Sequence, residues 1–363
     1  MTLVRKNIRE LSPYIAGKPI EETKREFNLK EVIKLASNEN PFGASPKAVA
    51  AIKKAASGVN RYPDSNNFYL KRKLASVFKL EPENFVLGNG SDELIDIVIK
   101  TFVNEDEAIL TSRQTFLEYE IISKVNNRKV VTLPLKGFKF DLEAIKKKIN
   151  SKTKLVFIAN PNNPTGTYVN KPELEKFLKG LPKNVIVVLD EAYDTFIDVK
   201  DYPRGVDYIK KDNLIVLQTF SKAYGLSGLR IGCAICAKHL SSFMEKTRQP
   251  FNVNLLAQAG ALAALDDKQF LKKTRDLTLK GKKYLYQAFR KMGLPYVRSA
   301  ANFILLDVKQ DCQVVFKDLL KLGIIVRDMK QYGLDNFVRV TIGMPAENAK
   351  FIKALKIVLF KKR

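Results

Sequence analysis

The sequence contains a single histidine, His239, and only three cysteines among its 363 residues. A zinc site built on two imidazoles is therefore excluded, and any Ser-His-Asp triad would have to include His239. Three cysteines are too few for a disulfide framework, which is typical of a protein from the reducing cytoplasm. Uninterrupted apolar runs, such as residues 185–189, are far shorter than the roughly 20 residues of a membrane span. Residues 1–14 show no apolar stretch typical of a secretory signal.

Acidic residues are scarce relative to basic ones, with 38 Asp and Glu against 63 Lys and Arg and a net charge of +25. A basic surface can bind nucleic acid nonspecifically. However, the lysines are spread along the chain, and arginines do not cluster with aromatic side chains as in specific nucleic-acid readers. We therefore expect no nucleic-acid or membrane partner and interpret the lysines as a solvated surface that attracts anionic metabolites.

The apolar pattern predicts an α/β fold, a mostly parallel sheet between helices followed by a smaller α+β domain. Short β-branched runs predict strands at residues 85–87, 108–111, 129–133, 155–159, 185–189, 214–218 and 231–236. Between the earlier runs, helical patterns occupy residues 91–102, 116–125, 141–149 and 171–178, and longer helices follow at 255–265 and 270–292. We predict an N-terminal arm at 1–30, a large domain at 31–250 and a small domain at 251–363.

Polar clusters follow four of the predicted strands, where the sites of parallel sheets lie. They occupy residues 88–93 (GNGSDE), 160–166 (NPNNPTG), 190–193 (DEAY) and 219–230 (TFSKAYGLSGLR). The first is a glycine turn into a helix N-terminus, which suits a phosphate, and taken alone it also fits an ordinary turn. Glu93 stands where a dinucleotide fingerprint requires its third glycine, so this motif does not favour NAD binding.

Two side chains of these clusters indicate a particular chemistry. Lys222 follows a buried strand and has Arg230 nearby, a setting that lowers a lysine pKa and favours Schiff-base formation. Asp190 ends a strand of aliphatic residues, where a buried carboxylate needs a partner, although a helix cap is an alternative role. A lysine together with an aspartate that faces a pyridinium nitrogen is typical of pyridoxal phosphate enzymes.

Motifs along nearly the whole chain resemble those of the histidinol-phosphate aminotransferases, fold-type I pyridoxal phosphate enzymes. The matching segments are 11–14 (LSPY) with Gly17, 37–43 (SNENPFG), 61–64 (RYPD), 88–95, 160–166, 190–193, 221–232 and 338–343 (VRVTIG). Residues 219–232 alone indicate the superfamily, whereas Pro13-Tyr14 and residues 61–64 indicate the family. The resemblance implies transamination between L-histidinol phosphate and 2-oxoglutarate in L-histidine biosynthesis, with glutamate as the amino donor in the biosynthetic direction.

The resemblance also implies a cofactor set and a catalytic set of residues. Lys222 would form the Schiff base with pyridoxal 5'-phosphate, Asp190 would pair with the ring nitrogen, and Tyr193 and Asn163 would bind the phenolic oxygen. The phosphate would be held by Ser91, Asp92, Ser221 and Arg230, and Phe116 would stack on the ring. Phe116 follows Gln114-Thr115, where the family usually has Pro-Thr or Pro-Ser, so the resemblance does not define this turn.

The substrate residues implied by the resemblance are Tyr14, Tyr62, Asn163, Arg327 and Arg339. Guanidinium groups bind phosphate or carboxylate bidentately, so Arg339 would serve both the substrate phosphate and the carboxylate of glutamate. Alternatives remain: a surface ion pair with Asp328 for Arg327, and plain packing for the two tyrosines. Tyr62 would reach the site of a neighbouring subunit, which implies a homodimer.

Other functions and sites remain as alternatives. An aromatic amino acid aminotransferase, a threonine-phosphate decarboxylase and a noncatalytic pyridoxal phosphate-binding regulator are compatible with the scaffold, although no DNA-binding segment is visible for the last. Cys233 and Cys236 have C-x-x-C spacing, but on a strand these positions face opposite sides, so we expect neither a redox pair nor a metal site. We expect His239 to be structural or exposed and Cys312 to be either buried or a surface thiol.

Overall fold

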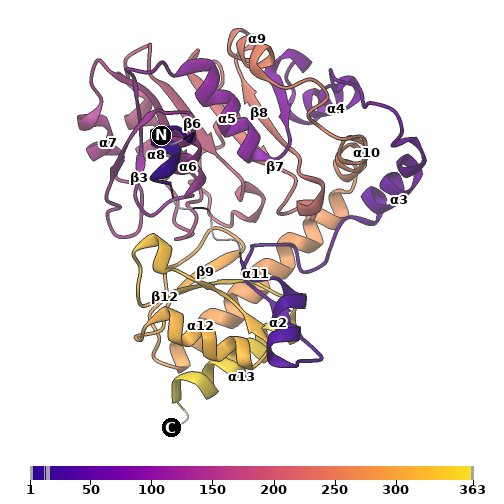
Figure 1. The fold of residues 1–363 in the computed structure, drawn as a ribbon, viewed down its shortest axis with the longest axis vertical. Helices are drawn as coiled ribbons and strands as arrows, with labels where there is room; N and C mark the ends of the chain where they lie inside the picture. The colour runs from indigo at the N-terminus through magenta and orange to yellow at the C-terminus, as the bar shows by residue number, and fades with distance from the viewer. Residues whose placement is uncertain (1–2, 12, 14–16, 361–363) are drawn as a thin grey trace.

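The computed structural model of the protein describes residues 3–11, 13 and 17–360. Figure 1 shows a larger and a smaller lobe, with the long helix α11 (Lys268–Lys291) running from one to the other. Each lobe has its own hydrophobic core, one made of residues between 48 and 265 and the other mainly of residues between 285 and 355. Among the described residues, no helix has the length and apolar character needed to cross a membrane.

The larger lobe is built on a seven-stranded sheet, as the strand pattern of the sequence predicts. Its strand order is β2-β8-β7-β6-β5-β3-β4. The strands from β7 to β4 pair in parallel, and β8 is antiparallel to both of its neighbours, β7 and β2. The strands are β2 (Phe85–Gly88), β3 (Ala108–Ser112), β4 (Lys129–Leu133), β5 (Thr153–Ala159), β6 (Ile186–Asp190), β7 (Leu214–Thr219) and β8 (Gly232–Cys236). The predicted α/β fold with a mostly parallel sheet is therefore confirmed.

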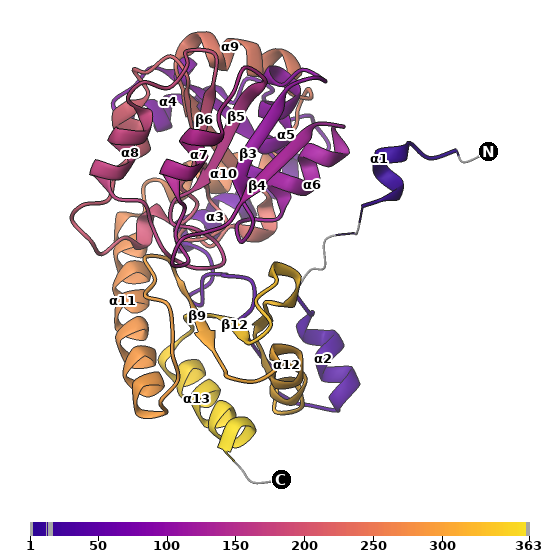
Figure 2. The same ribbon diagram turned by 90° about the vertical axis from the view of Figure 1, so that its left-hand side faces the viewer.

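Helices lie on both sides of this sheet in Figure 2, which explains why several strands are apolar at every position. They are α3 (Pro46–Ala55), α4 (Phe68–Phe78), α5 (Ser91–Phe102), α6 (Glu118–Val125), α7 (Leu142–Lys148), α8 (Lys171–Leu178), α9 (Lys238–Thr247) and α10 (Leu255–Ala264). The predicted first residues of α6 and α7 were too early. Leu117 is the N-cap of α6, and Asp141 caps α7 by accepting a hydrogen bond from the Ala144 amide at 2.9 Å.

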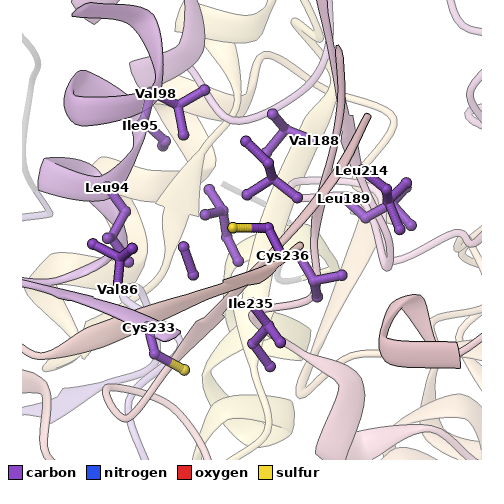
Figure 3. Packing of buried hydrophobic residues seen from close by; sticks show 14 of the residues in the cluster. Val86, Leu94, Ile95, Val98, Val188, Leu189, Leu214, Cys233, Ile235 and Cys236 are labelled. Carbon is purple, nitrogen blue, oxygen red and sulfur yellow. The ribbon is translucent and has the colours of Figure 1, made fainter. Parts of the chain in front are cut away.

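The C-x-x-C pair lies inside the core of the larger lobe. Figure 3 shows Cys233 and Cys236 on β8, among apolar side chains that include Leu94 and Val98 of α5. Both thiols are free and buried, and burial raises the pKa of each to about 12. Because the reactive species of cysteine is the thiolate, the two side chains contribute packing in this environment rather than redox chemistry.

The smaller lobe contains two small sheets covered by helices. One is antiparallel, in the order β11-β12-β9, and the other pairs β1 with β10 in parallel. The strands are β1 (Ile33–Lys34), β9 (Phe303–Asp307), β10 (Ile324–Ile325), β11 (Arg327–Asp328) and β12 (Phe337–Thr341). The helices are α2 (Ile20–Phe27), α12 (Cys312–Lys321) and α13 (Pro345–Phe360), whereas α1 (Lys6–Arg9) lies against α6 of the larger lobe.

The N-terminal segment belongs partly to the smaller lobe, because β1 pairs with β10 and Leu35 packs into its core. The proposed division at residues 30 and 250 stays a prediction. Short 3-10 helices complete the fold: η1 (Ala56–Gly58), η2 (Pro82–Asn84), η3 (Asp194–Phe196), η4 (Gly205–Tyr208), η5 (Ser227–Leu229) and η6 (Lys330–Tyr332).

Candidate active site

A cavity of about 350 Å³ lies where the carboxyl ends of β5, β6 and β7 meet the smaller lobe. All but two of the site residues expected from the sequence line this cavity. They are Ser91, Asp92, Phe116, Asn163, Asp190, Tyr193, Ser221, Lys222, Arg230, Arg327 and Arg339. The cavity therefore unites all four strand-end clusters with two arginines from a different sheet.

The two expected residues that do not line the cavity are tyrosines. Tyr14 lies outside the described residues. Tyr62 is 82% exposed and stacks on Phe251, with ring centroids 4.7 Å apart, at a separate surface cavity. Within one chain, Tyr62 therefore makes no contribution to the cavity that holds the other residues.

The N-terminus of α5 forms one end of the cavity. Gly90, at φ +85°, precedes the helix and supplies no side-chain cap, so the amides of the first turn keep no side-chain partner. The positive φ favours glycine at position 90, and a Cβ there would lie 2.5 Å from Nη2 of Arg230 and displace its guanidinium group. Arg230 donates to Asp92 Oδ2 at 2.9 Å and to Ser221 Oγ at 3.4 Å. Free amides, a hydroxyl and a guanidinium together make an anion-binding pocket.

The amine of Lys222 lies between the two lobes. Its Nζ donates a hydrogen bond to the carbonyl oxygen of Ser37 at 3.2 Å and lies 5.9 Å from the ring centroid of Tyr193. Burial lowers the pKa of Lys222 to about 8, and the nearby positive charges of Arg339 and Arg230 act in the same direction. A neutral amine is therefore accessible near physiological pH, which makes Lys222 a potential nucleophile and proton carrier.

The carboxylate of Asp190 is buried at the end of β6, where only 6% of the residue is exposed. Its Oδ2 accepts a hydrogen bond from the hydroxyl of Tyr119 at 2.6 Å, and its Oδ1 accepts one from the amide of Ala192 at 3.1 Å. Burial raises the pKa of Asp190, whereas both hydrogen bonds oppose that rise. The carboxylate is thus fixed in direction and in need of a cationic partner.

Arg327 and Arg339 face each other directly across the β11-β12 pair, as their register shows. Residues opposite each other in an antiparallel pair share one face, so both guanidinium groups reach the same cavity. Both residues are buried, which argues against a surface ion pair for Arg327. Arg339 donates to Asn163 Oδ1 and, at 2.6 Å, to the Ala36 carbonyl, whereas its buried Nε has no partner. An unpartnered buried donor points to an anionic ligand.

The turn before Phe116, where Gln114 stands in place of the proline of the resemblance, is held by hydrogen bonds from a neighbouring loop. Asn162 accepts a hydrogen bond from Thr115 Oγ1 at 2.8 Å and donates one to the Gln114 carbonyl at 2.9 Å. These bonds fix the turn from the neighbouring loop, and Phe116 lines the cavity. The side chain of Asn162 thus constrains the backbone at Gln114 and the side chain of Thr115.

Comparison with known proteins agrees with this geometry. The model of the aminotransferase class I and II family matches residues 30–355. The "Histidinol-phosphate aminotransferase 2" of Carboxydothermus hydrogenoformans is 46% identical over 359 residues, covering 98% of this chain and 99% of that protein. The enzyme named histidinol-phosphate aminotransferase from Moorella thermoacetica is 44% identical over 357 residues, which covers 98% and 92%. The chain belongs to the histidinol-phosphate aminotransferase family.

A crystal structure from the same family has a closely similar fold. The histidinol-phosphate aminotransferase of Sinorhizobium meliloti, solved in complex with pyridoxal 5'-phosphate, superposes with a TM-score of 0.91 at 28% identity. The match covers 99% of this chain and 98% of that one. The fold-type I architecture expected from the sequence is therefore confirmed over essentially the full length.

Several residues that line the cavity of the present chain were not predicted from the sequence as site residues. Ser37, Asn38, Glu39, Glu118 and Tyr119 all line it. Burial raises the pKa of Glu118, and the negative charge of Asp92 adds to that rise. Tyr119 lay inside a predicted helix, and the only available signal was that a buried tyrosine hydroxyl needs a hydrogen-bond partner. Elsewhere, His239 is exposed, as expected, and Cys312 is buried.

Proposed function

We propose that this protein is a pyridoxal 5'-phosphate-dependent transaminase that interconverts L-histidinol phosphate and 2-oxoglutarate with imidazole-acetol phosphate and L-glutamate. In the biosynthetic direction this reaction belongs to the formation of L-histidine. The observation that carries the proposal is the single cavity in which Lys222 and Asp190 meet two buried arginines. Relatives of 44–46% identity that bear the name histidinol-phosphate aminotransferase support it.

The residues of the cavity fit pyridoxal phosphate in three independent respects. The α5 N-terminus with Ser221 and Arg230 is a cradle for a doubly charged phosphate, and a Cβ at position 90 would fill it. The buried Asp190 carboxylate suits a protonated ring nitrogen, which would relieve its lack of a cationic partner. Lys222 supplies the amine that an aldehyde requires, at a lowered pKa.

The chain's own residues then have separable roles. When bound, pyridoxal phosphate withdraws electrons from the substrate carbon that carries the amino group. Lys222 Nζ, as a neutral amine, would accept the proton of that carbon and hold it for return. Asp190 would keep the ring nitrogen of the bound cofactor protonated. Tyr193 and Asn163 would hold its phenolic oxygen, and Phe116 would cover one face of the ring.

The two arginines account for a pair of substrates with different anionic groups. Histidinol phosphate ends in a phosphate, whereas glutamate carries carboxylates, and a guanidinium fork binds either group bidentately. Arg339, with its unpartnered Nε, serves both substrates, and Arg327 opposite it adds a second fork for the phosphate. The net charge of +25 favours the approach of both anionic substrates.

We further propose that the enzyme acts as a cytoplasmic homodimer in which Tyr62 completes the site of the partner subunit. Tyr62 and Phe251 border a surface cavity of about 620 Å³, and Phe68 and Tyr69 are also exposed nearby in sequence. Such a concentration of exposed aromatic side chains is typical of a subunit interface. A second copy of this chain is the occupant that would give Tyr62 a function.

The proposal is tested by the absorption spectrum of the purified protein with pyridoxal phosphate, followed by mixing with L-histidinol phosphate or L-phenylalanine. Rapid loss of the bound-cofactor band with histidinol phosphate and slow loss with phenylalanine is expected. Equal or faster loss with phenylalanine would favour an aromatic amino acid aminotransferase instead. If no bound-cofactor band forms, the cofactor assignment itself is wrong.

A further inference from the structure

The hydroxyl oxygen of Tyr193 accepts a hydrogen bond from a buried side-chain amide, that of Asn38. Nδ2 of Asn38 donates to the Tyr193 hydroxyl oxygen at 3.0 Å, and both side chains are buried. A phenol has a single proton, and Asn38 Nδ2 has only protons to give, so the Tyr193 proton cannot point toward that nitrogen. Burial raises the pKa of Tyr193, so the phenol keeps its proton at neutral pH. That proton is left for an acceptor in the cavity.

The orientation of the Asn38 amide is in turn set by Thr341 of β12. The Asn38 backbone amide donates to Thr341 Oγ1 at 2.9 Å, and Thr341 Oγ1 donates its own proton to Asn38 Oδ1 at 3.0 Å. Thr341 is 3% exposed, so its hydroxyl proton must find an acceptor inside the protein, and Asn38 Oδ1 provides it. With the oxygen held by Thr341, the amide nitrogen has to face Tyr193.

We propose that Asn38 and Thr341 are positioning residues that direct the Tyr193 hydroxyl proton into the cavity. The chain of donors runs from Thr341 through Asn38 to Tyr193 and spans both lobes. Thr341 lies two residues after Arg339 on the same strand. The strand that carries the proposed substrate arginine therefore also carries the residue that orients the Tyr193 hydroxyl. The inference deepens the proposed function and rests on the role of Tyr193 in it.

A purely structural role is the competing explanation, because Asn38 has φ +55° and its carbonyl accepts a hydrogen bond from Asn302 at 3.1 Å. The chain contains a matched control for the threonine. Thr153, also buried, accepts a hydrogen bond from the Asn150 amide at 3.0 Å and faces Asn150 Oδ1 at 3.5 Å, away from the cavity. Thr153→Val therefore removes a threonine hydroxyl that makes the same two contacts with an asparagine, but it does not affect the contacts of Tyr193.

The test is the dissociation constant of pyridoxal phosphate, measured by titrating apoprotein and following cofactor absorption. Thr341→Val is expected to raise it about tenfold, because a freely turning amide no longer directs the phenol proton. Thr341→Ser restores the hydroxyl and is expected to bind like wild type. Thr153→Val is also expected to bind like wild type, even if its melting temperature falls. Equal affinities for Thr341→Val and Thr153→Val would overturn the proposal.

A double-mutant cycle gives a second, independent readout. Asn38→Gly tolerates the positive φ, removes the amide and keeps the backbone bond to Thr341. If the two residues act as one unit, adding Thr341→Val to Asn38→Gly leaves the dissociation constant unchanged. Independent, multiplying effects would contradict the proposal. Wild-type turnover with histidinol phosphate is measured separately, so a failure of the proposed substrate would not be confused with a failure of this inference.

Discussion

The two walls of the cavity differ in how they are built. The wall of the larger lobe comes from residues 88–232 and stands on the ends of strands within one seven-stranded sheet. The opposite wall combines residues 36–39, which follow β1, with Arg327 and Arg339 of the three-stranded sheet, and these two parts are distant in sequence. The first wall holds the groups suited to a cofactor, and the second holds the groups suited to substrate anions. Substitutions of the arginines on one wall and of the cofactor-binding residues on the other should therefore have separable effects, whereas Asn38 links the two walls through its hydrogen bond to Tyr193.

Lys222 lies between the walls, bonded to the Ser37 carbonyl, and its loss should have the largest effect of all. We expect Lys222→Ala to lower turnover by about 10⁴-fold or more, because Lys222 carries the only side-chain amine among the described residues that line the cavity. The same variant should lose the absorption band of covalently held cofactor. Lys222→Arg serves as the control that keeps the charge, and normal turnover in either variant would contradict the assignment.

Asp190→Asn should have the next largest effect, about 10²-fold to 10³-fold on turnover, with cofactor still bound. The amide keeps the shape of the side chain, its single oxygen can still accept from the Ala192 amide, and its Nδ2 can donate to the Tyr119 hydroxyl oxygen. The neutral amide cannot, however, hold a positive charge on the ring nitrogen. Turnover and cofactor content are measured on the same preparation. Asp194→Asn, at a nearby half-buried carboxylate that does not line this cavity, is the control for the substitution itself.

The contrast between the walls also explains how far the sequence predicts this site. Residues 88–93, 160–166, 190–193 and 219–230 follow strands, and parallel strands bring their ends together whatever the details of packing. By contrast, Asn38 donates directly to the Tyr193 hydroxyl, and its amide is oriented by Thr341, which lies 303 residues along the chain. Tyr119 is recognisable only once its hydroxyl meets Asp190. Side-chain partners of this kind depend on tertiary packing, which periodicity and turn signals do not encode.

Arg339→Lys should affect the substrate wall selectively. A lysine keeps the charge but loses the bidentate fork, so KM for glutamate is expected to rise about 10-fold to 100-fold. The dissociation constant of pyridoxal phosphate should change far less. Arg327→Lys is the matched variant across the strand pair, and it should raise KM for histidinol phosphate more than KM for glutamate. An equal rise in KM for glutamate and for histidinol phosphate in both variants would mean that Arg327 and Arg339 do not differ in the substrate they bind.

Arg230→Gln should affect the cofactor wall selectively and by a smaller factor. The substitution removes the contacts to Asp92 and Ser221, and we expect the dissociation constant of pyridoxal phosphate to rise about tenfold. The α5 N-terminus still contributes its amides, which limits the loss. With saturating cofactor, KM for glutamate should stay close to its wild-type value. A large change in that KM would show that the walls are not separable.

The smallest expected effect concerns the influence of the Arg339 charge on the pKa of Lys222. Burial lowers the pKa of Lys222 to about 8, and the positive charge of Arg339 on the opposite wall contributes to this. Because only the neutral amine attacks an aldehyde, the rate of covalent cofactor capture by the apoprotein should rise with pH and level off above about pH 8. In Arg339→Gln the protonated amine is less disfavoured, so the midpoint should move upward, by less than about one pH unit. Stopped-flow absorption between pH 6 and pH 10 measures both midpoints. An identical midpoint in both proteins would mean that the charge of Arg339 does not affect the pKa of Lys222 and that burial alone lowers it.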